Sequence, residues 1–203
     1  MVKLQKEKVY ELALDIAKTV ARRKHSGTLI VIGPRDKFKG TYRRLYPQLL
    51  RRHYINEKGI KPVLNVLASL DGAILISDEG EIIAYGAMLR KIKTFKGFGT
   101  KHAAASGITT YIKRSTALLV SERIDWIKVF KGGKVVVEMD SAERSNKIQK
   151  DLINFLTDND TALLTAAGVS AAIVGFYPAL ILSGTYLVAK TAGGIIKKNL
   201  KSI

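Results

Sequence analysis

The spacing of apolar residues along the chain predicts helices that alternate with short, buried strands. Between residues 3 and 24, Ile16 and Val20 belong to an apolar set with three- and four-residue spacing, which is typical of an amphipathic helix. Thr28–Ile32 is a short, continuously apolar run, as in a strand that is covered on both faces, and Gly33 ends it.

Two hairpins and three more helices are predicted further along. The hairpins join Ala73–Ser77 to Glu81–Tyr85 through Asp78-Glu79-Gly80, and Trp126–Phe130 to Lys134–Glu138 through Lys131-Gly132-Gly133. Ala117–Val120 is another buried strand. The helices are expected from Pro62, over His102–Ile112, and from a capping box at Asp140 and Glu143 to about residue 157.

Residues 35–58 allow two interpretations. Arginines alternate with apolar and aromatic residues around Pro47, and the basic members are Arg43, Arg44, Arg51 and Arg52. A helix with a basic, solvated face and an apolar inner face is the favoured prediction. Aromatic residues interleaved with arginines also suit a nucleic-acid or phosphate surface, but no nucleic-acid-binding motif accompanies them.

This pattern predicts an α/β (α+β) fold, with a mixed, twisted central β-sheet flanked by helices and an apolar C-terminal helical tail. Three segments are expected: an N-terminal amphipathic helix over residues 1–25, a domain over residues 26–158, and the tail over residues 159–203.

The tail has a composition of its own. Residues 161–189 carry no charged side chain, and a helix of that length exceeds the roughly 30 Å of a bilayer's hydrocarbon core. Pro178 divides the run, so a membrane hairpin and a buried pair of helices at an oligomer interface are both open.

The net charge of the chain indicates which classes of binding partner it attracts. With 34 Lys and Arg against 17 Asp and Glu, the net charge is +17, which favours nucleotides, nucleic acid or an acidic membrane surface. The chain has no cysteine, which excludes disulfides and thiolate metal sites, and its charged N-terminus lacks the apolar core of a secretory signal. A cytoplasmic protein is expected, with membrane association through the tail as the alternative.

Three short blocks carry the candidate chemistry. They are Asp71-Gly72-Ala73 before an apolar run, Gly99-Thr100-Lys101-His102-Ala103-Ala104 before a helix, and Val120-Ser121-Glu122 after a strand. Each places glycine or polar residues at the end of an element, where unpaired backbone N–H groups can bind a phosphate.

In order and spacing, these blocks resemble the signature of the diadenylate cyclase (DisA N-terminal-like) family, as an archaeal-type or otherwise divergent member. The resemblance covers roughly residues 26–138. It implies an enzyme that condenses two ATP into cyclic di-AMP and releases two pyrophosphates, with Mn²⁺ or Mg²⁺ as cofactor. It also implies a homodimer or higher oligomer in which two domains meet face to face.

The resemblance assigns a role to each block. Asp71, His102 and Lys101 are the expected catalytic residues, and Asp71 and Glu122 the expected metal ligands. The expected ATP-binding residues are Gly72, Ala73, Leu89, Gly99, Thr100 and Ser121. Without the family, Asp71 would be read as a turn residue and Leu89 as a core residue.

Two departures from the family pattern leave an alternative function open. The acidic pair after the strand's serine is reduced to Glu122-Arg123, and both arginines of the second block are replaced. The family has arginines where this chain has Lys101 and Ala103; lysine keeps the charge but loses the bidentate fork, and alanine loses both. Lys113, Arg114 or a residue of a partner chain could replace the lost cation. The alternative is a catalytically weak or inactive nucleotide-binding protein, or a basic nucleic-acid-binding protein. The chain has no Walker, GxGxxG, HExxH or GxSxG motif, so it offers no support for hydrolase chemistry.

Overall fold

The computed structural model describes residues 4–23, 27–49, 51–94, 99–121, 126–142, 146–157 and 172–174. Its helices are α1 (Lys6–Ala21), the 3-10 helix η1 (Arg35–Phe38), α2 (Ile60–Leu67), α3 (Thr100–Tyr111) and α4 (Asn146–Thr157). Its strands are β1 (Thr28–Gly33), β2 (Tyr42–Arg44), β3 (Ala73–Ser77), β4 (Ile82–Leu89), β5 (Thr116–Val120), β6 (Trp126–Lys131), β7 (Lys134–Asp140) and β8 (Ala172–Val174).

All eight strands belong to one mixed sheet in the order β2-β4-β3-β1-β5-β6-β7-β8. The central strand β1 is buried at every position, pairs parallel with β3 and antiparallel with β5, and confirms the strand predicted from its apolar run. The two predicted hairpins form β3–β4 and β6–β7. The prediction of a mixed sheet flanked by helices is therefore confirmed.

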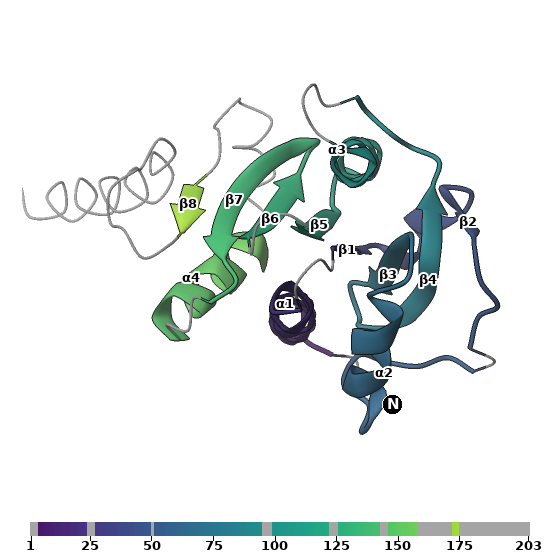
Figure 1. Cartoon of the computed structure of the whole chain (residues 1–203), viewed down its shortest axis with the longest axis horizontal. Helices are drawn as coiled ribbons and strands as arrows, with labels where there is room; N and C mark the ends of the chain where they lie inside the picture. Colours follow the sequence, from purple (N-terminus) through teal and green to yellow (C-terminus); the bar gives the residue numbers. More distant parts are fainter. Residues whose placement is uncertain are drawn as a thin grey trace, which may run out of the picture.

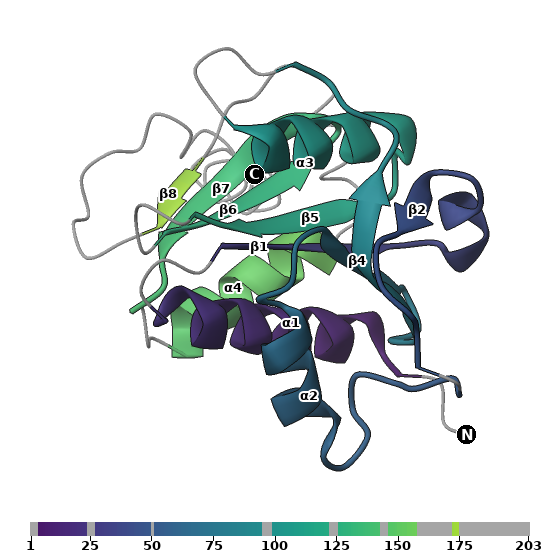
Figure 2. The same cartoon turned by 45° about the vertical axis from the view of Figure 1, so that its right-hand side comes forward.

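The helices cover the two faces of the sheet unequally. Helices α1, α2 and α4 lie on one face, and α3 lies on the other (Figures 1 and 2). The larger hydrophobic cluster joins α1, α2 and α4 to alternate strand residues such as Ile30 and Ile74. The smaller cluster packs α3 and Phe38 against Leu29 and Leu75, whose side chains point to the opposite face.

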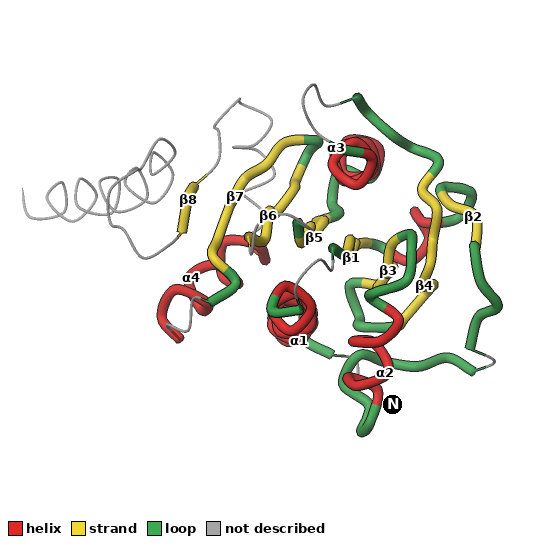
Figure 3. The backbone as a smooth tube through the Cα atoms, in the orientation of Figure 1, coloured by secondary structure: helices red, strands yellow, loops and turns green. Residues whose placement is uncertain are grey.

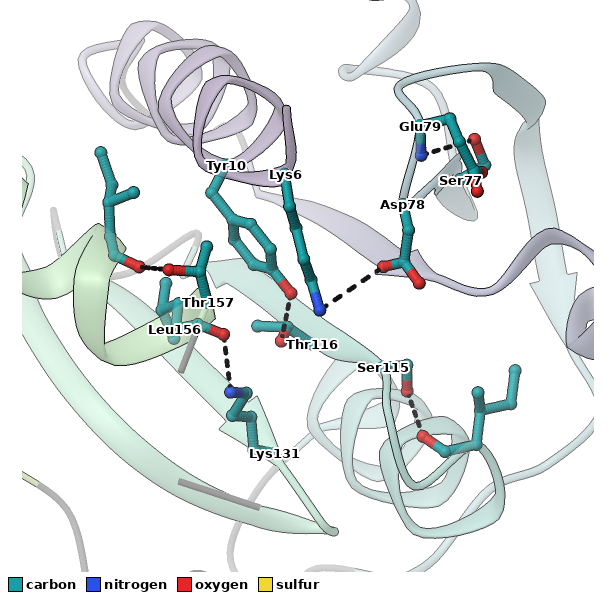
Figure 4. Close-up of polar contacts among 12 residues, drawn as sticks. Lys6, Tyr10, Ser77, Asp78, Glu79, Ser115, Thr116, Lys131, Leu156 and Thr157 are labelled. Atoms are coloured by element: carbon teal, nitrogen blue, oxygen red, sulfur yellow. Dashed lines mark hydrogen bonds and ion pairs between the residues drawn. The ribbon is translucent and has the colours of Figure 1, made fainter. Parts of the chain in front are cut away.

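Two polar contacts join helices to the sheet on the larger side (Figure 4). The Tyr10 hydroxyl lies 2.8 Å from Thr116 Oγ1, and burial raises the pKa of the phenol. Lys131 Nζ donates to the carbonyl of Leu156 at 2.7 Å, near the C-terminal end of α4. These contacts satisfy polar groups that burial would otherwise leave without a partner.

The predicted helix over residues 35–58 is wrong. Only η1 is helical there; β2 follows it, and residues 45–49 form no regular element (Figure 3). Tertiary contacts hold this segment extended: Gln48 bonds to the backbone of Tyr85, and the Tyr85 hydroxyl donates to the carbonyl of Pro47.

Two predicted helix starts are also wrong. Helix α2 begins at Ile60, with Gly59 as its N-cap, so Pro62 lies within the first turn rather than at its start. Asp140 ends β7 instead of capping a helix: its Oδ1 accepts the N–H of Ala142, and α4 begins at Asn146. Glu143, the other half of the predicted capping box, lies outside the described residues.

Of the predicted helical tail, the structure describes only Ala172–Val174. These residues form the strand β8, which pairs parallel with β7. The structure therefore has a strand at these three residues, where a helix was predicted. The rest of residues 159–203 lies outside the described residues. Within the part of the chain that is described, no helix is both long and apolar enough to span a bilayer.

Candidate active site

The first block, Asp71-Gly72-Ala73, leads into β3 through a backbone turn that requires glycine. Gly72 has a φ of +94°, and a Cβ there would lie 2.6 Å from the carbonyl carbon of Gly86 and 2.8 Å from the nitrogen of Ala87. No side chain fits that space, because real Cβ atoms do not approach backbone so closely. Asp71 is exposed beside this turn, and its Oδ1 accepts the N–H of Gly72 at 2.8 Å.

The register of the sheet brings the first and third blocks to one edge. Leu29 of β1 pairs with Ala73, and Thr28 pairs with Val120. We call this edge, where β1 and β3 begin and β4 and β5 end, the N-terminal edge. Asp71 and Ser121 therefore lie on either side of Gly27, the residue before β1.

The second block reaches the same place through Lys101. The Lys101 ammonium donates to the carbonyl of Gly27 at 3.1 Å, which ties the first turn of α3 to the N-terminal edge. By the register of β1 and β3, the backbone of Asp71 lies beside Gly27, about one strand spacing of 4.8 Å away. Asp71, Lys101 and Ser121 thus gather around Gly27.

Helix α3 presents its N-terminus without a capping side chain. Its N-cap is Gly99, no side chain of the described residues caps the helix start, and Gly99 and Thr100 are both exposed. The first N–H groups of a helix lack intrahelical acceptors and carry the positive end of the helix dipole. This arrangement suits a phosphate, and Thr100 adds a hydroxyl.

Ala73 and Leu89 lie beneath α3 in the smaller hydrophobic cluster. They are 1% and 8% exposed, so each is mainly a core residue. Leu89 ends β4 opposite Tyr42 of β2, at the N-terminal edge.

His102 is directed away from the group around Gly27. Its ring meets the ring of Phe130 edge to face, with centroids 6.0 Å apart. Burial lowers the pKa of His102, and the nearby ammonium of Lys128 lowers it further. Phe130 belongs to β6, which lies three strands from β3, so the His102 ring packs over a different strand from the one that Asp71 precedes.

Ala103 occupies the second of the two positions at which the family motif has an arginine. Its carbonyl accepts the N–H of Lys93 at 2.9 Å, so the segment after β4 runs alongside α3. Lys113 and Arg114 follow the other end of this 12-residue helix, about 18 Å from its start. That one of them, or a residue of a partner chain, replaces the lost arginine stays a prediction.

The metal prediction depends on Asp71 and Glu122. Glu122 lies outside the described residues. Within the described ranges no three His, Cys, Asp or Glu side chains gather into a metal site. Mg²⁺ and Mn²⁺ are commonly held by one or two carboxylates together with substrate phosphates, and the exposed Asp71 fits that arrangement.

Two features of the site were missed from the sequence. Gly27 was taken only as the residue before a strand, yet its carbonyl is the acceptor that fixes Lys101. Lys128 and Glu138 form a largely buried ion pair, 3.0 Å apart, on the strands that face His102. The period-2 pattern of β6 hints at a polar position but not at its partner.

Comparison with known proteins covers the same region. The model of the family described as DAC, DisA bacterial checkpoint controller nucleotide-binding, matches residues 15–135. A diadenylate cyclase from Haloferax volcanii is 30% identical over 138 residues, which are 65% of this chain and 51% of the relative. A diadenylate cyclase from Methanocaldococcus jannaschii is 29% identical over 139 residues, which are 66% of this chain and 45% of the relative.

The chain therefore spans about half the length of these two relatives. A solved structure from Bacillus cereus, described as a hypothetical membrane spanning protein, has a TM-score of 0.50 and 22% identity. The match covers 61% of this chain and 59% of that one. At this identity the likeness supports the fold alone.

Proposed function

Because this chain belongs to the DisA bacterial checkpoint controller nucleotide-binding (DAC) family, we propose that it is a diadenylate cyclase. It condenses two ATP into cyclic di-AMP and releases two pyrophosphates. The observation that carries the proposal is the family match over residues 15–135, which contains all three blocks. The gathering of Asp71, Lys101 and Ser121 around Gly27 supports it.

The reaction joins the 3′-oxygen of one ATP to the α-phosphorus of the other. The 3′-hydroxyl loses its proton, the new P–O bond forms, and the bond to the pyrophosphate breaks. Such phosphoryl chemistry depends mainly on positioning and on neutralising phosphate charge. We assign phosphate binding to Ser121, to the ammonium of Lys101 and to the uncapped first turn of α3 that follows Gly99 and includes Thr100.

Asp71 is the proposed acid of the site. One of its oxygens accepts the Gly72 N–H, and a carboxylate so held keeps lone pairs for a further ligand. It would hold Mg²⁺ or Mn²⁺ together with phosphate oxygens, with Glu122 as the second proposed ligand. The cation would supply neutralisation of the triphosphate charge when bound.

We propose that Gly72, Ala73 and Leu89 bind the nucleoside. The missing Cβ of Gly72 and the small side chain of Ala73 let a ring approach the start of β3, and Leu89 extends the apolar surface. His102 stays a proposed catalytic residue. Its lowered pKa keeps the imidazole neutral at pH 7, so it would act as a hydrogen-bonding group rather than as a cation.

The proposed assembly is a face-to-face homodimer. One domain that holds one ATP offers either the hydroxyl or the α-phosphate of a bond, so two domains must meet for both bonds to form. This requirement also gives His102 and Asp71 of different chains a way to serve one reaction, although they lie at different strands within one chain.

A second candidate function rests on Lys101 and Ala103. The lysine ammonium is bound to the carbonyl of Gly27, and Ala103 offers no cation, so the chain has less charge for the triphosphate than the family pattern supplies. A nucleotide-binding protein with weak or absent catalysis fits this observation.

One experiment separates the two functions. Purified protein is incubated with ATP and either Mn²⁺ or Mg²⁺, and the products are identified by mass; ATP binding is measured in parallel. Cyclic di-AMP in the wild-type reaction supports the cyclase. Binding of ATP without any cyclic product favours the second function, and an absence of ATP binding contradicts both.

A further inference from the structure

A hollow in the surface is lined by no residue of the three blocks that form the candidate active site. It is a groove of about 810 Å³, within the range of about 300–1,000 Å³ that small-ligand sites occupy. Most of its lining follows the C-terminal ends of β1 and β3, where α/β sheets commonly bind ligands. The lining residues are Pro34, Arg35, Asp36, Phe38, Lys39, Tyr42, Arg44, Asp78, Glu79, Glu81, Ile83 and Arg114.

Three of the four carboxylates in this groove already have cationic neighbours. Glu81 lies 3.0 Å from Arg35 and 3.7 Å from Arg52, measured to each guanidinium Nε. Asp36 lies 3.0 Å from the ammonium of Lys37. Asp78 lies 4.0 Å from the ammonium of Lys6 (Figure 4). These carboxylates therefore add little negative potential for an incoming ligand.

The lining itself carries four cations and four carboxylates, and a surplus of cations comes from the partners that three of those carboxylates have outside the lining. Lys39, Arg44 and Arg114 line it from three separate parts of the fold. Within the described residues, none of these three side chains lies in an ion pair with a carboxylate. Counting the pairing partners as well, seven cations stand around four carboxylates. Such a surplus attracts an anion.

The groove also has an apolar wall. Phe38 is fully buried beneath it, and Tyr42 and Ile83 are partly buried and pack on the same hydrophobic cluster. Arginine side chains are suited to phosphate through their paired N–H groups, and an aromatic and aliphatic wall is suited to a flat ring.

We propose that this groove binds a small phosphate ester of nucleotide size, at a site separate from the active site. Lys39, Arg44 and Arg114 contact the phosphate, and Tyr42 and Ile83 contact the ring. This binding does not depend on the proposed cyclase activity.

The test uses calorimetric titration of the full chain at physiological salt with three probes: AMP, inorganic phosphate and adenosine. AMP carries both phosphate and ring, and the other two carry one part each. AMP that binds more tightly than both phosphate and adenosine supports the proposal. Equal affinity for AMP and phosphate shows that the ring is not bound, and adenosine that binds as tightly as AMP shows that the phosphate is not bound; either result overturns the proposal.

Matched variants locate the binding. Arg44→Ala with Arg114→Ala should lose one site or weaken it at least tenfold. Arg43→Ala with Lys58→Ala removes the same charge from residues that neither line the groove nor pair with its carboxylates, and should change the affinity less than twofold. Equal losses in the two double variants, or no loss in the first, overturn the proposal. If the first double variant fails to fold, Lys39→Ala alone replaces it, with the same expected direction.

A last arm keeps this proposal apart from the proposed function. Asp71→Asn should lose cyclic di-AMP formation and retain the groove site. If the wild type makes no cyclic di-AMP, and AMP binding is present in the wild type but lost in the Arg44 and Arg114 double variant, the cyclase proposal is contradicted and the groove proposal is supported.

Discussion

Gly72 shows how a single residue fixes the entry to a strand. Its left-handed backbone and the contact with Gly86 and Ala87 leave no room for a side chain, and the neighbouring Asp71 takes its position from that turn. The sequence predicts a turn here from the Asp-Gly pair. It does not reveal Gly86, because that contact depends on how β4 returns beside β3.

Gly72→Ala is expected to destabilise the protein by at least about 2 kcal/mol, because strain at a positive φ adds to a clash with backbone. Gly40→Ala is the matched control, since Gly40 also has a positive φ (+76°) but no atom lies within 4 Å of its added Cβ. That change should cost only about 1 kcal/mol. Chemical denaturation measures both, and equal losses would contradict the account of the turn.

Asp78 offers a prediction about pH. Burial raises the pKa of its carboxyl in spite of the nearby Lys6, so the folded protein holds this proton more tightly than the unfolded chain does. The charged carboxylate therefore costs stability above its folded pKa, and this cost disappears as the pH falls through that value. Asp78→Asn should raise the melting temperature at pH 7, and the gain should vanish below about pH 4.

Thermal melts at several pH values check this expectation. Asp36→Asn is the control, because the exposed Asp36 has its pKa lowered by Lys37 and should show no gain. A loss of stability in Asp78→Asn at pH 7 would contradict the assignment.

At the scale of elements, short apolar runs were reliable guides and mixed polar segments were not. Thr28–Ile32 and the Gly132-Gly133 turn predicted β1 and the β6–β7 hairpin, because burial on both faces and tight turns leave strong local signals. Residues 35–58 have helix-like spacing, but the contacts of Gln48 and Pro47 with Tyr85 hold the chain extended. Such distant partners are invisible in local spacing.

In the candidate site too, local features were predicted from the sequence and features that depend on distant residues were not. Local signals identified all three blocks, and the register of the strands brought Asp71 and Ser121 to one edge. The direction of His102 was not predictable, because it depends on Phe130 and on the Lys128–Glu138 pair of strands that come later in the chain.

The first turn of α3 carries the prediction at this scale. Lys101→Met is expected to lower kcat/KM for ATP by about tenfold to a hundredfold, because it removes both the bond to Gly27 and a charge near the phosphates. Lys113→Met removes the same charge just beyond the other end of α3 and should change kcat/KM less than threefold. Steady-state kinetics decide the matter, and similar effects of the two changes would argue against a phosphate site at the start of α3.

At the scale of the whole molecule, one sheet carries both the candidate active site and the groove. The three blocks meet the N-terminal edge near Gly27, whereas most of the lining of the groove follows the C-terminal ends of β1 and β3, and Tyr42 and Arg44 of β2 complete it. The proposed reaction requires two domains, whereas the proposed groove requires one. The need for a dimer therefore distinguishes the proposed reaction from the proposed ligand binding in the groove.

Cyclic di-AMP formation should depend on protein concentration. If two domains build each product, specific activity should fall on dilution as the dimer dissociates, and sedimentation measured over the same range should show the matching loss of dimer. Specific activity that stays constant in a protein that is monomeric throughout would contradict the face-to-face assembly.

The most direct test of the central claim compares two aspartates at the same edge of the sheet. Asp71 and Asp140 each accept a nearby backbone N–H at 2.8 Å, but Asp140 ends β7, four strands away from β3. The measurement is the rate of cyclic di-AMP formation from ATP by wild type, Asp71→Asn and Asp140→Asn. The account predicts a loss of at least about 100-fold for Asp71→Asn and little change for Asp140→Asn. Equal rates in the two variants, or a wild type that makes no cyclic di-AMP, would contradict it.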